Sequence, residues 1–245
     1  MKKGQEMAKK VAKKTKSAEK LLTNVAIVLD ASGSMGAMQR EAVDGFNQQV
    51  AELKKPANKK LGYRVSLVTF DSTVHEPKIW DKPVSKISEL ERKDYVTGGM
   101  TALLDAIGST ITKMEALPSN AKPQKGLNVA NLLIIITDGQ ENQSKEYAAP
   151  NGYAKIKEKI EALQKKNWTF TFMGANMNVM EVACKGLGIH AGNTMCFVPT
   201  GAGYAAGAQG ATGAVGPAGV YTATRSAGGQ SVSSFYDPAN KGKKA

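Results

Sequence analysis

The sequence predicts an α/β fold: a doubly wound, mostly parallel central sheet with helices on both faces and one antiparallel edge strand. Residues 25–29 are an uninterrupted aliphatic run, and residues 131–136 contain another, as in strands buried on both faces of a sheet. Such runs alternate with segments of helical periodicity, which indicates parallel strands joined by crossover helices. Folds of this kind bind ligands at the carboxyl ends of their strands.

The elements that this fold requires can be assigned from apolar periodicity along the chain. The first strand leads through a glycine-containing turn, residues 32–36, into a helix that Pro56 ends. One face of this helix carries Val43, Phe46, Val50 and Leu53. The expected later elements are strands at 64–70 and 74–80 that pair as a hairpin, a helix from Leu103 to Leu117, the strand at 131–136, a helix through Ile156, Ile160 and Leu163, a strand at 168–173, a short helix near 179–185 and a short strand near 195–198.

The positive charge of the chain is concentrated at its ends. Lys and Arg outnumber Asp and Glu by 33 to 21, but eight of the lysines lie within residues 1–20, against two glutamates. We therefore distinguish a basic N-terminal arm, residues 1–22, from a domain, residues 23–198, that carries little net charge. This distribution does not indicate a nucleic-acid-binding domain. The arm is interpreted as a solvated tail, and contact with an anionic surface is the alternative.

A third region, residues 199–245, differs from the domain in composition. It contains 10 Gly and 11 Ala among 47 residues, with few large apolar side chains. Five glycines from Gly207 to Gly219 fall three residues apart, a collagen-like spacing that is too short to hold a triple helix by itself. We expect a flexible or loosely packed segment here.

Other features of the sequence exclude several classes of protein. No stretch approaches the roughly 20 apolar residues of a membrane helix, and Met1 to Lys20 lacks the apolar core of a secretory signal. We therefore expect a protein that is not exported and is cytoplasmic or, if phage-encoded, part of a virion. Two cysteines, Cys184 and Cys196, are too few for a disulfide framework or a four-thiolate zinc site. Unpaired buried thiols are expected, and a single bridge is the alternative.

Three loops rich in oxygen donors lie at, or lead to, the carboxyl edge of the predicted sheet. The first follows the first strand, the second opens a helix, and the third follows the central strand. They contain no His or Cys. Hard oxygen donors favour Mg²⁺, with Mn²⁺ or Ca²⁺ as alternatives, over zinc or copper. The candidate ligands are Asp30, Ser32 and Ser34 in residues 30–34, Thr101 in residues 99–101 and Asp138 in residues 137–139.

The charges of these donors predict what the site would bind. One divalent ion and the carboxylates of Asp30 and Asp138 sum to zero charge, and the three hydroxyls are neutral. A metal ion held mainly by hydroxyls keeps much of its Lewis acidity, and an octahedral ion would keep water that an outside ligand can displace. The sequence therefore predicts an ion that is bridged to an Asp or Glu carboxylate of a protein partner.

The three loops together resemble the metal-ion-dependent adhesion site of the von Willebrand factor type A domain. The resemblance covers roughly residues 22–198 and implies a Rossmann-like fold. It also implies that the three hydroxyls bind the ion directly, whereas Asp30 and Asp138 do so directly or through water. The matching motifs are Asp-x-Ser-x-Ser at 30–34, Gly-x-Thr-x-Leu at 99–103 and Thr-Asp-Gly at 137–139.

The resemblance is to the small bacterial and phage members of this family rather than to its secreted adhesion proteins, since no export signal precedes the domain. The chain also departs from the adhesion receptors of the family. In those receptors a C-terminal amphipathic helix moves when a ligand binds the metal. The matching stretch here is rich in Gly and Ala and shows no apolar stripe, so this switching mechanism is not expected.

Each motif also has an ordinary structural interpretation. Asp30 and Ser32 could cap a helix, and Asp138 with Gly139 could form a tight turn. The occurrence of all three loops with intact ligand types favours the metal site over these separate roles. Asp71, just after the second strand, is interpreted as a turn residue.

An enzyme is not expected. The chain has no P-loop motif, and His75 and His190 lie far apart with no acidic or nucleophilic motif beside them, so both are interpreted as structural or exposed. No Lys, Arg or His lies within the three loops to stabilise a leaving group, which makes a metal-dependent hydrolase the least favoured hypothesis. The leading hypothesis is a metal-dependent protein–protein interaction module. The alternative is a structural subunit of a larger assembly such as a phage virion, with the arm and the Gly/Ala-rich end threading between like or unlike subunits.

Overall fold

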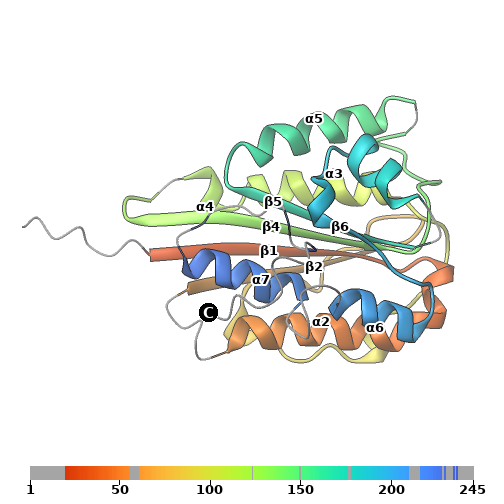
Figure 1. Cartoon of the computed structure of the whole chain (residues 1–245), viewed down its shortest axis with the longest axis horizontal. Helices are drawn as coiled ribbons and strands as arrows, with labels where there is room; N and C mark the ends of the chain where they lie inside the picture. The colour runs from red at the N-terminus through yellow and green to blue at the C-terminus, as the bar shows by residue number, and fades with distance from the viewer. Residues whose placement is uncertain are drawn as a thin grey trace, which may run out of the picture.

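A computed structural model of the chain describes residues 20–55, 61–122, 124–148, 150–175, 178–209, 216–227, 229, 234 and 236. It contains a six-stranded sheet with the strand order β3-β2-β1-β4-β5-β6 (Figure 1). β3 pairs antiparallel with β2, and the other neighbouring strands pair in parallel. The predicted doubly wound α/β fold with one antiparallel edge strand is therefore confirmed. The strands are β1 (Lys20–Asp30), β2 (Leu61–Phe70), β3 (Ile79–Pro83), β4 (Leu127–Thr137), β5 (Trp168–Gly174) and β6 (Thr194–Cys196).

Helices cover both faces of the sheet. In Figure 1, α3, α4 and α5 lie above the strands, and α2, α6 and α7 lie below them. The α-helices are α2 (Gln39–Lys54), α3 (Leu103–Glu115), α4 (Pro118–Ala121), α5 (Gly152–Gln164), α6 (Gly201–Gln209) and α7 (Gly216–Ser226). Shorter turns of other helix types are η1 (Gly33–Met38), η3 (Val84–Lys86), η4 (Arg92–Asp94), the π-helix η5 (Met180–Gly186) and η6 (Ala191–Asn193).

The central strands are buried on both faces, as their aliphatic runs predicted. Along β4, Leu132 and Ile134 belong to the core under α2, whereas Leu133 and Ile135 belong to the core under α3 and α5. This alternation follows from the two-residue repeat of a strand, which points successive side chains to opposite faces. Each face of the sheet therefore has its own apolar layer, and the strand ends between the layers are free to carry polar groups.

Several element boundaries differ from those predicted. β1 begins at Lys20, three residues before the predicted start of the domain, because Leu21 and Leu22 pair with backbone of both β2 and β4. The third strand begins at Ile79 rather than near residue 74, where only a single bridge joins Val74 to Phe70. Residues 1–19 of the predicted basic arm lie outside the described residues.

The expectation of a loosely packed segment after Pro199 is wrong for α6 and α7. Tyr204 and Tyr221, which these helices contribute, are 1% and 0% exposed and belong to the core under α2. One face of α7, formed by Ala218, Tyr221, Thr222 and Arg225, is nevertheless buried. This face includes two polar side chains, so it is not an apolar stripe, and a search for apolar periodicity does not detect it.

The collagen-like spacing of glycines does not produce collagen-like backbone where the structure describes it. Gly207 lies in α6, and Gly216 and Gly219 lie in α7. An α-helix excludes the extended polyproline conformation that a triple helix requires. Gly210 and Gly213 lie outside the described residues.

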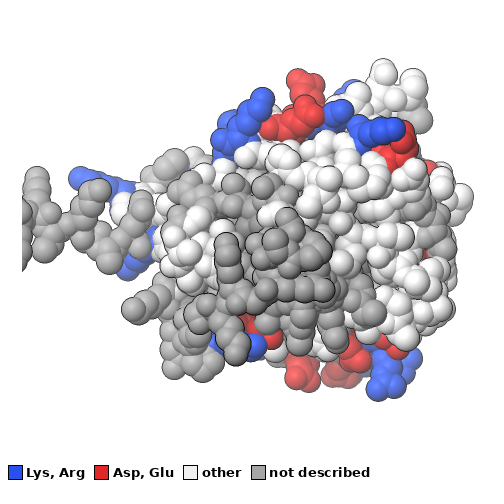
Figure 2. Space-filling model, in the orientation of Figure 1, with Lys and Arg blue, Asp and Glu red and all other residues white. Residues whose placement is uncertain are grey.

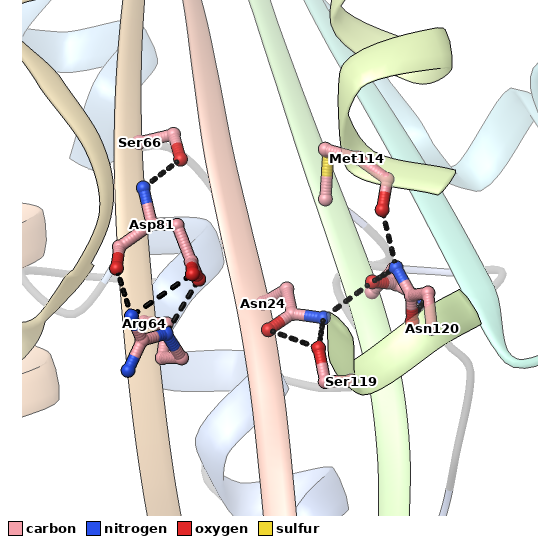
Figure 3. Close-up of polar contacts among 8 residues, drawn as sticks. Asn24, Arg64, Ser66, Asp81, Met114, Ser119 and Asn120 are labelled. Atoms are coloured by element: carbon pink, nitrogen blue, oxygen red, sulfur yellow. Dashed lines mark hydrogen bonds and ion pairs between the residues drawn. The ribbon is translucent and has the colours of Figure 1, made fainter. Parts of the chain in front are cut away.

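Hydrogen bonds between polar side chains join the central strands to each other and to α4 near the amino end of the sheet, as Figure 3 shows. Asn24 of β1 donates through Nδ2 to Ser119 Oγ of α4 and to Asn131 Oδ1 of β4, both at 3.0 Å. Asn120 donates to the same Asn131 oxygen at 2.9 Å. This network satisfies buried amides and joins α4 to two strands, at the end of the sheet opposite to the carboxyl edge.

The two cysteines are both unpaired, as expected. The further expectation that they are buried is wrong, because Cys184 is only partly buried and Cys196 is exposed on the short edge strand β6. No helix among the described residues has both the length and the apolar character needed to cross a membrane.

Candidate metal centre

The candidate ligands lie at the carboxyl edge of the sheet, where β1 and β4 end beside each other. Asp30 is the last residue of β1, and Asp138 follows Thr137, the last residue of β4. The two strands pair in parallel from Lys20 to Leu29 of β1, so their ends reach the same edge. Two carboxylates from distant parts of the chain are thereby placed side by side.

Hydrogen bonds link four of the five candidate ligands into one group. Ser34 Oγ donates to Asp138 Oδ1 at 2.6 Å and lies 3.3 Å from Ser32 Oγ. The backbone N–H of Ser32 donates to Asp30 Oδ1 at 2.7 Å. The turn after β1 therefore places two hydroxyls between the two carboxylates.

Thr101 reaches the same group from the loop before α3. A Cβ atom built on Gly139 would lie 3.0 Å from Thr101 Oγ1 and 3.9 Å from Asp30 Oδ2, so both oxygens face the backbone of residue 139. Backbone hydrogen bonds from Gly33 and Gly98 hold the loop of Thr101 against the turn after β1. All five residues predicted from the sequence are therefore brought together.

Three further residues support the group and were not predicted as site residues. Thr137 Oγ1 donates to Asp30 Oδ2 at 2.5 Å, and the Tyr95 hydroxyl donates to the main-chain oxygen of Asp30. Asn142 Oδ1 accepts the N–H of Thr101 at 2.9 Å. Thr137 belongs to the Thr-Asp-Gly motif and could have been found there. Tyr95 and Asn142 gave no sequence signal, because their roles depend on the path of long loops.

Tyr95→Phe is expected to lower the free energy of unfolding by about 1 kcal/mol and to leave metal affinity unchanged. Tyr95 is 1% exposed, and the substitution removes the hydroxyl that donates a hydrogen bond to the buried main-chain oxygen of Asp30. Chemical denaturation in EDTA measures the stability, and titration with Mg²⁺ measures the affinity. Tyr153→Phe is the control, since the Tyr153 hydroxyl has no hydrogen bond within the described ranges. A tenfold loss of affinity at unchanged stability would contradict this supporting role.

Burial governs the ionisation of the two carboxyl groups. Asp30 is 0% exposed and Asp138 is 1% exposed. Burial raises the pKa of Asp30 to about 6, although hydrogen bonds from Thr137 and Ser32 act in the opposite direction, and the charge of Asp138 raises it further. Burial likewise raises the pKa of Asp138, which the hydrogen bond from Ser34 partly offsets. In the part of the chain that the structure describes, neither carboxylate has a basic partner, so a cation would supply the missing countercharge.

The donor set fits a hard divalent cation. Among the described residues, no three His, Cys, Asp or Glu side chains form a group that could hold a metal, so a metal here depends on hydroxyl oxygens. Thr101 is 3% exposed, and its hydroxyl oxygen faces the backbone of Gly139 beside Asp30 Oδ2. Ser34, in contrast, is exposed. The group thus offers oxygen donors and one side that faces solvent.

The other polar residues considered from the sequence take structural positions. Asp71 Oδ1 accepts the N–H of Thr73 at 3.0 Å and lies 3.2 Å from His75 Nε2, as expected for a turn residue. His75 Nδ1 lies 3.0 Å from Thr69 Oγ1, and His190 is exposed. None of these three side chains, Asp71, His75 and His190, belongs to the group at the ends of β1 and β4.

A mostly parallel sheet whose carboxyl edge gathers hydroxyl and carboxylate oxygens from three loops defines an α/β domain with a candidate ligand site at that edge. The chain belongs to the von Willebrand factor type A domain family, which it matches over residues 24–201. No curated protein matches its sequence.

Similar solved structures include those of proximal thread matrix protein 1 from the mussel byssus. Two of them are 17% identical, have TM-scores of 0.48 and 0.47, and cover 75% and 72% of this chain. A third, described as having a zinc-occupied MIDAS motif, is 16% identical with a TM-score of 0.48 and covers 74% of this chain. The matches cover only 42–43% of the mussel chains, so this chain spans less than half of their length.

Proposed function

We propose that this chain is a divalent-metal-dependent protein–protein interaction module in which the bound ion coordinates an acidic residue of a partner. Membership of the family supports a module of this general kind. The observation that carries the proposal is the convergence of hydroxyls on two buried carboxylates that lack a basic partner among the described residues. Mg²⁺ is the proposed ion, with Mn²⁺ or Ca²⁺ as alternatives. The proposed ligands are Asp30, Ser32, Ser34, Thr101 and Asp138.

The residues of the chain would hold and orient these ligands. Thr137 and the N–H of Ser32 occupy one hydrogen-bonding position on each oxygen of Asp30, which keeps that carboxylate in a single orientation. Asn142 holds the backbone of Thr101. When bound, the ion would supply a positive charge and a coordination position for the partner's carboxylate. Neutral hydroxyls would leave much of that charge available to the partner.

The proposal includes a non-enzymatic role, since the three loops carry no Lys, Arg or His that could assist a leaving group. A bacterial or phage origin and a cytoplasmic or virion location belong to the same proposal. The alternative of an assembly subunit uses both the basic arm and the C-terminal end to reach neighbouring subunits, and residues 1–19 of the arm lie outside the described residues. α6 and α7 pack on α2 within the chain, which favours the interaction module.

Capture of a partner with and without chelator tests the proposal. The full chain on a solid support is expected to retain a protein partner in Mg²⁺ and to release it in EDTA. Ser32→Ala/Ser34→Ala removes two candidate ligands and is expected to reduce both Mg²⁺ affinity and retention by about tenfold or more. Ser109→Ala/Ser226→Ala is the matched control, because those hydroxyls bond only to helix backbone. Retention that persists in EDTA and in the first variant would contradict the proposal.

A further inference from the structure

Exposed large apolar side chains are grouped near the candidate metal centre. Four such side chains occur among the described residues: Val96, Met100, Met180 and Val198. Val96, Met100 and Val198 lie in loops at the carboxyl edge of the sheet and are 72%, 47% and 63% exposed. Met180 instead lies against Thr194, at the start of the edge strand β6. Single exposed apolar residues are ordinary, but their gathering at one edge indicates an interaction surface.

Val96 and Met100 flank the metal centre on the side of β2. They belong to the loop that also carries Thr101. The N–H of Gly98 donates to the main-chain oxygen of Ala31 at 2.8 Å, which places this loop against the turn after β1. The N–H of Met100 donates at 2.9 Å to the hydroxyl of a serine that follows β2. The two side chains are therefore in the loop layer that borders the candidate ligands.

Val198 flanks the metal centre on the opposite side. The N–H of Phe197 donates to the oxygen of Gly174 at 2.9 Å, and the N–H of Ala175 donates to the oxygen of Thr137 at 3.1 Å. These bonds align the ends of β4, β5 and β6, so Val198 emerges two strands away from Asp138. With strands about 4.8 Å apart, the edge from β2 to β6 spans about 19 Å, and the candidate ligands lie within this span.

The loop segments that carry these apolar residues contain no charged residue of their own, although Asp71 lies beside Gly99 and Glu41 lies beside Gly201. Residues 31–38, 95–102 and 197–200 contain no Asp, Glu, Lys or Arg. In Figure 2, charged side chains gather above, over α5, and below, over α2, whereas the described surface at the right-hand end, toward which β1 and β4 run, is mostly uncharged. A cation in such surroundings interacts strongly with a carboxylate once a partner excludes water, because the local dielectric falls.

We propose that Val96, Met100 and Val198 form an apolar rim that selects partners whose metal-binding Asp or Glu is flanked by large apolar side chains. This inference rests on the proposed function of the same centre. The positive charge of the ion attracts the partner's carboxylate. The rim, which continues from the ligand loops, then contacts the residues on either side of that acidic residue in the partner. Leu or Phe there would be buried against the rim, whereas polar neighbours would leave the rim exposed. Met100 can adapt its shape to different apolar neighbours.

Three immobilised peptides of equal length test the rim. One carries Glu between leucines, the second carries Glu between serines, and the third carries Gln between leucines. The full chain is applied over a range of concentrations in Mg²⁺ and in EDTA, and the bound fraction is measured. In Mg²⁺ the Leu-flanked Glu peptide is expected to bind about tenfold more tightly than the Ser-flanked one. Neither is expected to bind in EDTA, and the Gln peptide is not expected to bind.

Val96→Thr/Met100→Gln/Val198→Thr is expected to abolish this tenfold preference. The substitutions keep side-chain size at exposed positions, so Mg²⁺ affinity and binding of the Ser-flanked Glu peptide should be unchanged. Met180→Gln is the matched control, since it makes the same change at an exposed residue outside the rim, and it should keep the preference.

The possible failures of the rim and of the proposed function are distinct. Equal metal-dependent binding of the two Glu peptides would overturn the rim and leave the proposed function standing. Mg²⁺ binding without binding of either Glu peptide would overturn the proposed function, and the rim with it. Equal binding of the Glu and Gln peptides flanked by leucine, unaffected by EDTA, would overturn both, because the surface would then bind apolar peptides without a carboxylate.

Discussion

Asp30→Asn is expected to weaken Mg²⁺ binding by about 100-fold while the chain stays folded. The variant keeps the size of the side chain and an oxygen that can accept the N–H of Ser32, but it removes one of the two negative charges. Only Asp138 would then offset the charge of the ion. Calorimetric titration with Mg²⁺ measures the affinity, and unchanged affinity would exclude Asp30 as a ligand.

The same substitution is expected to stabilise the metal-free chain near neutral pH. Burial raises the pKa of Asp30 to about 6 from its ordinary 3.8, so between these pH values the folded state binds a proton more tightly than the unfolded state. The contribution of Asp30 to the free energy of unfolding therefore falls as pH rises through this window. A shift of this size corresponds to a loss of at most about 3 kcal/mol, complete above pH 6. Asn cannot ionise and does not suffer this loss.

Denaturation in EDTA from pH 4 to pH 8 measures this effect as the difference between the two proteins. The free energy of unfolding of the Asn variant minus that of the unchanged chain is expected to increase as pH rises. Asp44→Asn is the control, because it makes the same chemical change at a side chain that is 57% exposed and lies on α2, outside the candidate ligands. A flat or falling difference for Asp30→Asn would contradict the effect of burial on this carboxyl group.

The candidate site could be predicted because strand ends place its residues. Asp30 and Asp138 each follow an unbroken aliphatic run, and two such strands in parallel must end at one edge. The position of Thr101 required more, since its loop reaches that edge through backbone bonds of Gly33 and Gly98. Apolar periodicity contains no information on such backbone bonds. The prediction of Thr101 therefore depended on the Gly-x-Thr-x-Leu motif.

The C-terminal helices could not be predicted in the same way. Their buried face uses Tyr221, Thr222 and Arg225, which are not the residues that a hydrophobic pattern selects. Specific partners satisfy polar groups of α7 where the helix is buried: the hydroxyl of Tyr63 donates to Thr222 Oγ1 at 3.0 Å, and Gln49 Oε1 accepts the main-chain N–H of Ala218 at 2.8 Å. Those partners lie far away in sequence, on β2 and α2, so only the assembled fold defines the helix face.

Arg225→Ala is expected to lower the free energy of unfolding by about 3–5 kcal/mol. Arg225 is 1% exposed and lies in the last turn of α7, against the amino end of the sheet. Its guanidinium donates to both the side-chain and main-chain oxygens of Asn128, at 3.0 and 3.1 Å, and to Thr23 Oγ1 at 3.3 Å. None of these partners is acidic, so amide and hydroxyl dipoles balance the buried charge. Truncation leaves buried acceptors without a donor and opens a cavity.

Arg225→Met separates these two costs, because methionine keeps much of the packed volume and removes only the donors. We expect it to be destabilising by about 2 kcal/mol, less than Arg225→Ala, while Arg40→Ala, at a side chain 71% exposed, changes stability by about 0.5 kcal/mol or less. Denaturation monitored by tryptophan fluorescence and by circular dichroism should give one coincident transition for each protein, because α7 shares its core with the sheet. Arg225→Ala within 1 kcal/mol of Arg40→Ala would contradict this role of the C-terminal helix. An early separate transition would show that α7 detaches before the sheet unfolds.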